Sequence, residues 1–195
     1  MRADAARNLE LLLTTGARML AEDPATSIAA IAAEAGVDRR TVYRRFTSRE
    51  ELLAAVYQAR LDAIEAAIEA ARLWEAPVPE ALRRYVQEIV KVNRTWPTDV
   101  SRMRSDPEIW ARRQRAVDEV DRFLKRATAE GFLRTGLPPR WPGSVLGSLL
   151  RLSTQDLSVL NDGLAADVIV DTFLRALGTP SAISAARSAS SGEAG

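Results

Sequence analysis

Apolar residues recur at helical spacing along nearly the whole chain, and this periodicity constrains the fold more than any other feature. One such stripe is formed by Leu9, Leu12, Leu13, Ala17 and Leu20. Alternating runs of Val, Ile and Thr bounded by turns, which are typical of strands, do not occur. We therefore predict an all-α protein of about nine helices, without an internal repeat.

Caps and breaks set the order of these helices. The predicted helices cover residues 9–22, 27–35, 38–46, 48 to beyond 68, 79–94, 106–130, 143–160 and 164–177, with at most a short helix between 98 and 105. The turn Asn161-Asp162-Gly163 is so short that the last two long helices are expected to be antiparallel neighbours. The segment from Thr179 is rich in Ser, Ala and Gly, and we expect it to be a disordered tail.

Composition narrows the chemistry. The chain of 195 residues is long enough for a large core, and it contains neither Cys nor His. Thiolate nucleophiles, imidazole bases and Cys or His metal ligands are therefore absent, and nothing indicates a metal or cofactor. The longest stretch without a charged residue spans eleven positions, 176–186, too few to cross a bilayer as a helix. The charged N-terminus does not resemble a signal peptide, so we expect a cytoplasmic protein without a membrane segment.

The most informative stretch is residues 26–52, TSIAAIAAEAGVDRRTVYRRFTSREEL. Two short helices meet at Ala35-Gly36-Val37-Asp38, where Gly permits a tight turn and Val37 fills the angle. This is the pattern of a helix-turn-helix, whose second helix fits a major groove about 12 Å wide. Val42 and Phe46 are four residues apart and are expected to face the core. Ser48 and Glu51 form a capping box that opens the following long helix.

Positive charge is concentrated in this motif. Residues 37–49 contain five Arg and one Asp, a net charge of +4 in a protein whose total is +1. An ordinary solvated helix face would explain any single Arg, but the cluster together with the turn favours contact with double-stranded DNA. The candidate DNA-binding residues, which would contact base edges or phosphates, are Thr26, Ser27, Arg39, Arg40, Thr41, Tyr43, Arg44, Arg45 and Arg49.

The pattern of residue types in this stretch resembles a known family signature. It consists of Thr26, Ile31, Ala32, Ala35, Gly36, Val37, Asp38, Thr41, Val42, Tyr43, Phe46, Arg49, Glu50 and Leu52 at these spacings. The pattern is similar to that of TetR-family (tetracycline-repressor-type) transcriptional regulators. Asp38 and Arg49 stand where that family usually has Ser and Lys, and we expect Arg49 to keep a phosphate contact. The resemblance implies a DNA-binding domain over residues 1–50, a helical ligand-binding and dimerisation domain over 51–178, and a tail over 179–195.

The resemblance also implies an effector pocket between the long helices. Large or polar side chains on the central helices are the candidates, although an aromatic stripe is more often simply core. The candidate ligand-binding residues are Tyr85, Asn93, Trp96, Met103, Trp110, Gln114, Phe123 and Thr154. Gln155 is a further polar group that we consider. Aromatic walls without a clear internal charge favour a small apolar or aromatic effector.

A homodimer through the last two long helices is the second implication. Both helices carry many apolar residues: Leu146, Leu149, Leu150, Leu157 and Leu160 on the first, and Leu164, Val168, Ile169, Phe173 and Leu177 on the second. Gly143, Ser144, Gly147 and Ser148 would allow a partner helix to approach closely. A plain core hairpin is the alternative, and a four-helix dimer bundle is the interpretation that we favour.

We therefore expect a homodimeric, ligand-responsive DNA-binding regulator that represses from a near-palindromic operator and is not an enzyme. Two alternatives remain. An all-α enzyme would use carboxylates such as Glu88 or Asp156, but it leaves the Arg cluster unexplained. A protein-binding adaptor would retain the motif only as a scaffold, and the exposed Arg residues argue against it.

Overall fold

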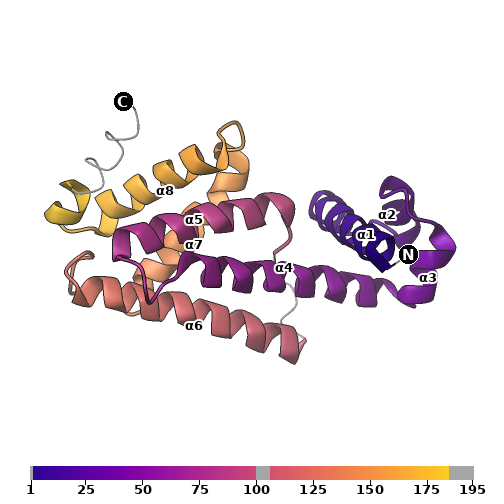
Figure 1. The fold of residues 1–195 in the computed structure, drawn as a ribbon, viewed down its shortest axis with the longest axis horizontal. Coiled ribbons are helices and arrows are strands. Elements are labelled where there is room, and N and C mark those ends of the chain that lie inside the picture. The colour runs from indigo at the N-terminus through magenta and orange to yellow at the C-terminus, as the bar shows by residue number, and fades with distance from the viewer. Residues whose placement is uncertain (1, 100–105, 185–195) are drawn as a thin grey trace. The chain divides into compact units, whose positions relative to one another are not determined.

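The computed structural model describes residues 2–99 and 106–184. Eight helices run through these residues (Figure 1): α1 (Arg2–Glu22), α2 (Ile28–Glu34), α3 (Arg39–Arg45), α4 (Arg49–Ala71), α5 (Val78–Thr95), α6 (Pro107–Ala129), α7 (Trp141–Asp156) and α8 (Asp162–Leu177). A short helical segment follows at 180–184, and one isolated bridge joins Leu133 to Gly178. The all-α prediction is confirmed. Most of the short helix considered at 98–105 lies outside the described residues.

The described residues form two compact units, and α4, α5 and α6 each contribute to both. The first unit contains residues up to 63 together with 94–99 and 106–113, and the second contains 64–93 and 114–184. The predicted domains, residues 1–50, 51–178 and 179–195, were drawn from the sequence motifs, and their boundaries stay a prediction. No helix in the described part of the chain has the length and hydropathy needed to span a membrane.

The core of the first unit forms around the apolar stripe of α1. Leu12, Ala17 and Leu20 are buried there, as their helical spacing predicts. A Cβ atom at Gly16 would lie 3.4 Å from a methyl carbon of Val56 on α4 and 3.5 Å from one of Ile31 on α2. The small residue therefore allows α1 to pack closely against both helices, which anchors the helix-turn-helix on its inner side.

The second unit has its core between the apolar face of α5 and the two C-terminal helices. The helically spaced apolar residues of α5 are buried, and Phe123 and Phe173 are both fully inaccessible; these α5 residues are Leu82, Tyr85, Val86, Ile89 and Val90. After α8 the chain returns to the α6–α7 connection, where the Arg134 amide donates to the Leu177 carbonyl at 2.9 Å and the Thr179 amide to the Phe132 carbonyl at 3.1 Å. The segment after α8 is thus fastened to the unit.

The start of the predicted tail is ordered. The Thr179 hydroxyl donates to the Gly131 carbonyl at 2.8 Å, residues 180–184 are helical, and Ala182 is buried. Composition alone misses this because the anchoring groups lie almost 50 residues upstream. The remaining residues of the predicted tail, 185–195, lie outside the described residues.

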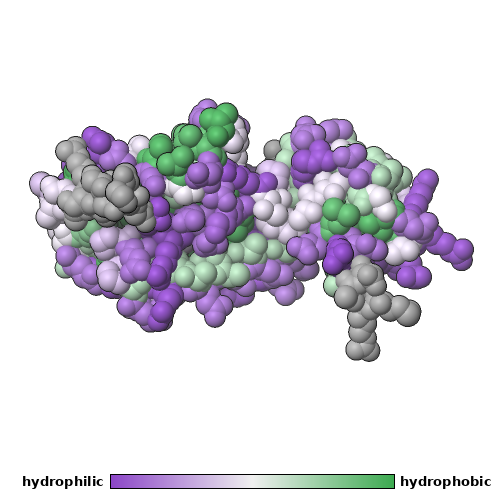
Figure 2. All heavy atoms as spheres, turned by 45° about the horizontal axis from the view of Figure 1, so that its top comes forward, coloured by the Kyte–Doolittle hydropathy of each residue, from purple (hydrophilic) through white to green (hydrophobic). Residues whose placement is uncertain are grey.

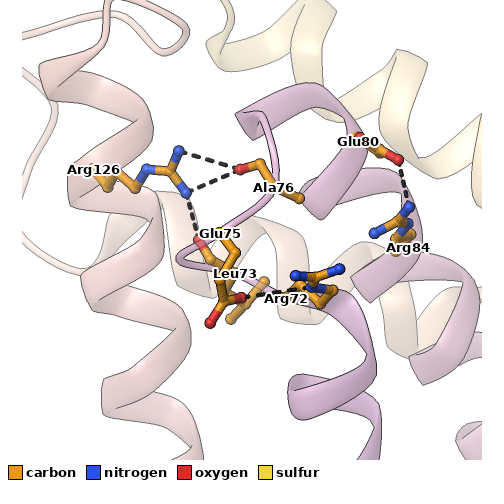
Figure 3. Close-up of polar contacts among 7 residues, drawn as sticks. All are labelled: Arg72, Leu73, Glu75, Ala76, Glu80, Arg84 and Arg126. Atoms are coloured by element: carbon orange, nitrogen blue, oxygen red, sulfur yellow. Dashed lines mark hydrogen bonds and ion pairs between the residues drawn. The ribbon is translucent and has the colours of Figure 1, made fainter.

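The guanidinium of Arg126 on α6 binds two backbone carbonyls of the α4–α5 connection (Figure 3). α4 ends at Ala71 because Arg72 adopts a left-handed conformation, with φ of 52°. Arg126 then donates from Nη1 to the Leu73 carbonyl at 2.6 Å, and from both Nη atoms to the Ala76 carbonyl at 3.2 Å. These carbonyls are left without helical partners by the break, so Arg126 acts as a cap that is supplied by another helix.

The α7–α8 hairpin differs in detail from the prediction. α7 ends at Asp156 rather than at Leu160, and α8 begins at Asp162. Asn161 was expected within the turn, but its Oδ1 accepts from the Leu164 amide at 2.9 Å and caps α8. The preference of Asn for the cap position explains the earlier start of this helix.

Candidate nucleic-acid interface and effector residues

The predicted helix-turn-helix is present. α2 and α3 have seven residues each, and Gly36 between them adopts φ of 64°, a conformation that strains any residue with a Cβ atom. The amide of Val37 donates to the Ala32 carbonyl at 3.0 Å, which ends α2. Oδ1 of Asp38 accepts from the Thr41 amide at 3.0 Å and begins α3. Local backbone chemistry thus builds the turn.

α3 has a distinct inner and outer face. Val42 is 1% exposed and Phe46, which follows the helix, is 6% exposed, which confirms that both face the core. Thr41, Tyr43 and all the arginines of the helix are exposed. The exposed side of α3 therefore presents only polar, positively charged and aromatic groups.

The exposed arginines of α3 keep their charge unneutralised. Arg39, Arg40, Arg44 and Arg45 form no ion pair with any described residue. Arg39 lies over the Tyr43 ring, 5.2 Å from its centroid, and Arg45 lies 6.0 Å from the centroid of Phe46. Some exposed arginines elsewhere do have acidic partners: Arg18 lies 2.7 Å from Glu34, and Arg175 lies 2.6 Å from Asp171.

The predicted contacts at the start of α2 are engaged within the protein. The hydroxyl of Thr26 donates to the Asp23 carbonyl at 2.8 Å, and Oγ of Ser27 accepts from the Ala30 amide at 3.2 Å. Arg49 donates from Nε to the Thr26 carbonyl at 3.3 Å. A contact of these three residues with DNA stays a prediction, and the link between Arg49 and residue 26 was not foreseen.

The capping box at the start of α4 is confirmed and extends further than predicted. Oγ of Ser48 accepts from the Glu51 amide at 3.1 Å. The Glu51 carboxylate accepts from the Thr47 amide at 2.7 Å and from the Thr47 hydroxyl at 2.9 Å. These bonds, that of the amide foremost, lower the pKa of Glu51. The short connection from α3 to α4 is therefore fixed by side chains.

The predicted effector residues differ in burial and in the unit to which they belong. Tyr85, Asn93, Trp96 and Phe123 are buried, and Trp110, Gln114 and Thr154 are half-buried; Met103 lies outside the described residues. Trp96 and Trp110 belong to the first unit, and the other described candidates belong to the second. Gln155, also considered, is exposed. A common pocket for these residues stays a prediction.

Polar groups do lie inside the second unit. Asn93 donates from Nδ2 to the Leu150 carbonyl at 3.0 Å, and the hydroxyl of Ser153 donates to the same carbonyl at 2.7 Å. Ser153 is 1% exposed, yet the sequence did not single it out, because a serine inside a helix gives no signal of its direction. Burial, and to a lesser extent Asp121, raises the pKa of Tyr85, so its hydroxyl remains protonated.

The apolar residues of the last two helices divide between the core and the surface. Leu146, Leu150, Ile169, Phe173 and Leu177 are buried within their own chain, whereas Leu164 and Val168 on α8 are exposed. Figure 2 shows hydrophobic residues gathered at the surface over α8 and the α7–α8 connection. This surface is the part of the predicted dimer face that remains available to a partner.

Gly143 makes a close contact inside the chain that was not foreseen, and its role toward a partner helix stays a prediction. A Cβ atom at this position would lie 2.3 Å from Oδ1 of Asp121 on α6. Asp121 is in turn held by Nε of Arg140 at 3.0 Å. The absence of a side chain at Gly143 therefore allows the start of α7 to pack against α6.

Neither of the two acids considered for the enzymatic alternative is buried. Oε1 of Glu88 lies 2.6 Å from Nζ of Lys91, one helical turn further along α5, and Asp156 is exposed at the end of α7. Their positions give no support to that alternative.

An all-helical chain whose N-terminal part carries a capped helix-turn-helix with a bare cationic face is a helix-turn-helix regulator by class. The sequence model described as "Bacterial regulatory proteins, tetR family" matches residues 12–56. The HTH-type transcriptional repressor LfrR of Mycolicibacterium smegmatis is 31% identical over 177 residues, which is 88% of each chain. The chain thus belongs to the tetR family of bacterial regulatory proteins and is a transcriptional regulator.

Solved structures agree with this assignment. The TetR-like regulator LfrR from Mycobacterium smegmatis in complex with proflavine has a TM-score of 0.70 and 27% identity, and the match covers 87% of this chain and 96% of that one. The ketosteroid transcriptional regulator KstR2 of Mycobacterium tuberculosis has a TM-score of 0.72 at 20% identity, with coverage of 86% and 93%, and supports the fold. Both of these proteins are described as transcriptional regulators.

Proposed function

We propose that this protein is a homodimeric repressor that binds a near-palindromic operator through α3 and is released by a small apolar or aromatic effector. The observation that carries the DNA-binding part is the outer face of α3, where Arg40 and Arg44 are exposed and have no ion-pair partner among the described residues. A face that only kept the protein soluble would tolerate neighbouring acids, as the faces around Arg18 and Arg175 do. A phosphate-binding face has to remain free of them.

The chemistry of α3 suits a major groove. An arginine fork can pair with O6 and N7 of guanine, or it can hold a phosphate. Thr41 and Tyr43 add exposed hydroxyls beside it. In a dimer, two copies of α3 would enter successive major grooves about 34–36 Å apart, so the operator would be a near-palindrome.

The dimer would form through the exposed apolar part of α8. Leu164 is 52% exposed and Val168 is 43% exposed, four positions apart on one side of the helix. A second copy would cover this stripe through the same surface, as two-fold symmetry requires. The shortened α7 leaves the α7–α8 connection, with Val159 almost fully exposed, at the edge of that contact.

The effector would occupy the interior near the candidate residues. Asn93, Ser153 and the protonated Tyr85 hydroxyl provide polar groups among apolar walls such as Phe123. That composition suits a ligand with a large apolar or aromatic body and few polar groups. The related LfrR has been solved with proflavine, a planar aromatic molecule, which makes proflavine a reasonable first probe. Repression would end because the effector binds more tightly to a dimer state that does not fit the operator.

Selection from a pool of random DNA duplexes tests the DNA-binding part. The full-length protein should enrich an inverted repeat whose half-sites are about one helical turn apart. Enrichment of a single half-site would argue against the dimeric arrangement. A pool that shows no enrichment at all would contradict the regulator function.

A titration of the protein with proflavine in the absence of DNA tests the effector part. We expect saturable binding, and we expect Tyr85→Phe to require more proflavine for half-saturation. Tyr57→Phe is the matched control, since Tyr57 is a buried tyrosine outside the candidate set. Equal behaviour of the two variants would remove Tyr85 from the effector site, and failure of a wider set of aromatic compounds to release DNA would contradict an aromatic effector.

A further inference from the structure

Arg49, the first residue of α4, extends back onto the connection between α1 and α2. Its Nε donates to the Thr26 carbonyl at 3.3 Å, and its Nη2 donates to the Pro24 carbonyl. The residue is half-buried, in contrast to the arginines of α3. Two of its donors are therefore directed to backbone oxygens of its own chain rather than to solvent.

The connection that Arg49 contacts is already a closed turn. Oδ1 of Asp23 accepts from the Ala25 amide at 2.9 Å, and the Asp23 carbonyl accepts from the Thr26 amide at 3.1 Å and from the Thr26 hydroxyl at 2.8 Å. The turn leaves the carbonyls of Pro24 and Thr26, two residues apart, available as acceptors. A planar guanidinium fork can serve two such acceptors at once, which a single ammonium group does less well.

We propose that Arg49 is a positioning residue for DNA binding, which ties the two ends of the helix-turn-helix together, rather than a phosphate ligand. Residues 27–48 carry α2, the turn and α3, and Arg49 joins the residue before this segment to the residue after it. The two hydrogen bonds from Arg49, to the Thr26 and Pro24 carbonyls, form this tie and hold α2 in place relative to the start of α4. Because α3 is connected to α2 by the turn at Gly36 and to α4 by the connection at Thr47, its direction depends on both.

This inference rests on the proposed function, but a positioning role requires a different chemistry of the side chain at position 49 than phosphate binding does. A phosphate ligand at position 49 needs a positive charge, which Lys also supplies. A tie between two carbonyls needs the fork, so Lys should replace it poorly. Arg40 is the matched comparison, because it is exposed on α3 and its guanidinium has no ion-pair or hydrogen-bond partner in the described part of the chain.

The test uses full-length Arg49→Lys, Arg49→Gln and Arg40→Gln with the duplex selected above, over a series of salt concentrations. We expect Arg49→Lys and Arg49→Gln to weaken binding by about tenfold, roughly the equivalent of one hydrogen bond to a charged group, with an unchanged slope of log K against log salt. Arg40→Gln should reduce that slope by about one. Hydrogen exchange supplies a readout without DNA: both Arg49 variants should exchange faster over residues 24–34, and Arg40→Gln should not.

Two results would overturn the proposal. In the first, Arg49→Lys is indistinguishable from the wild type while Arg49→Gln lowers the salt slope by about one, which would make Arg49 a phosphate ligand. Exchange over residues 24–34 that is unchanged in both variants would show that the tie orders nothing. A failure of the proposed function is recognised separately, because then the wild-type protein itself selects no duplex.

Discussion

The guanidinium of Arg60, in the middle of α4, donates from Nη1 to the carbonyl oxygen of Trp96, the first residue after α5. Burial lowers the pKa of this guanidinium to about 10, an effect that the charges of Asp99 and Tyr57 oppose. Two residues further along α4, Asp62 lies 2.7 Å from Nη2 of Arg112 on α6. Within the first unit, α4 is thus bonded to the end of α5 and to the start of α6.

Replacement of Arg60 by Met should cost little stability. The folded pKa of about 10 lies below the ordinary value of a guanidinium, so the charged form is disfavoured in the folded state, and stability should rise as the pH increases above about 10. Asp99 is exposed and keeps its hydration when Arg60 is removed. We expect a loss of about 1 kcal/mol at pH 7 for the missing bond to Trp96, measured by urea unfolding. A loss of more than about 3 kcal/mol would show that the cost of burying the Arg60 charge does not offset most of the stability that its contacts contribute.

Gly36 should be sensitive to substitution for a purely conformational reason. Nothing lies within 4 Å of a Cβ atom built there, but its φ is 64°. Gly36→Ala should therefore destabilise the protein by about 1 kcal/mol in urea unfolding. Gly163→Ala is the control: Gly163 lies in α8 with only an ordinary contact at 3.5 Å, and there the same change should stabilise by about 0.5 kcal/mol. Equal effects at both positions would contradict the role of the turn.

Glu51 should make the α3–α4 connection sensitive to acid. Its pKa is lowered in the folded state by hydrogen bonds from Thr47, so its contribution is present above the ordinary value of 4.5 and is lost as the pH falls through the lower folded value. Melting temperatures of the wild type and of Glu51→Gln should therefore differ at pH 7 and converge in strong acid. A constant difference across this range would show that the charged carboxylate is not the group that matters.

Arg44 should contribute to the choice of sequence. If its fork reads guanine, Arg44→Ala should cost about 1–3 kcal/mol on the selected duplex and much less on random DNA. Arg84→Ala is the control, since it removes the same charge from α5, where Arg84 is paired with Glu80 (Figure 3). An equal loss on both kinds of DNA would assign Arg44 to phosphate contact alone.

The exposed stripe of α8 should control the oligomeric state. Leu164→Glu places a charge on the proposed dimer face and should give a monomer in sedimentation or light scattering. Leu11→Glu is a matched control on α1, because Leu11 is 48% exposed and Leu164 is 52% exposed. A dimer that persists in Leu164→Glu would exclude this part of α8 from the interface.

The features that could be predicted from the sequence depend on neighbouring residues. Gly36, Asp38 and Ser48 act on amides or dihedral angles within three residues, so the turn and its caps could be recognised from the motif alone. The four-residue spacing of Val42 and Phe46, with arginines between them, predicted the buried and exposed faces of α3 for the same reason. Helical periodicity similarly predicted which face of α5 is buried.

The features that could not be predicted join residues far apart in the chain. Arg49 bonds to Thr26, Asn93 bonds to Leu150, and Gly143 packs against Asp121. No local pattern indicates such pairs, because an arginine or a glycine is compatible with many surroundings. For this reason neither the contact of Gly143 within the chain nor the burial of Ser153 was foreseen.

The central claim is that the outer face of α3 binds a specific operator. The most direct measurement is the fluorescence anisotropy of labelled DNA from upstream of the gene for this protein, with a scrambled duplex as control, at a stated salt concentration. We expect salt-sensitive binding by a dimer that prefers the upstream duplex, and we expect that preference to be lost in Arg44→Ala. Equal binding of both duplexes, together with a random pool that yields no enriched sequence, would contradict the claim.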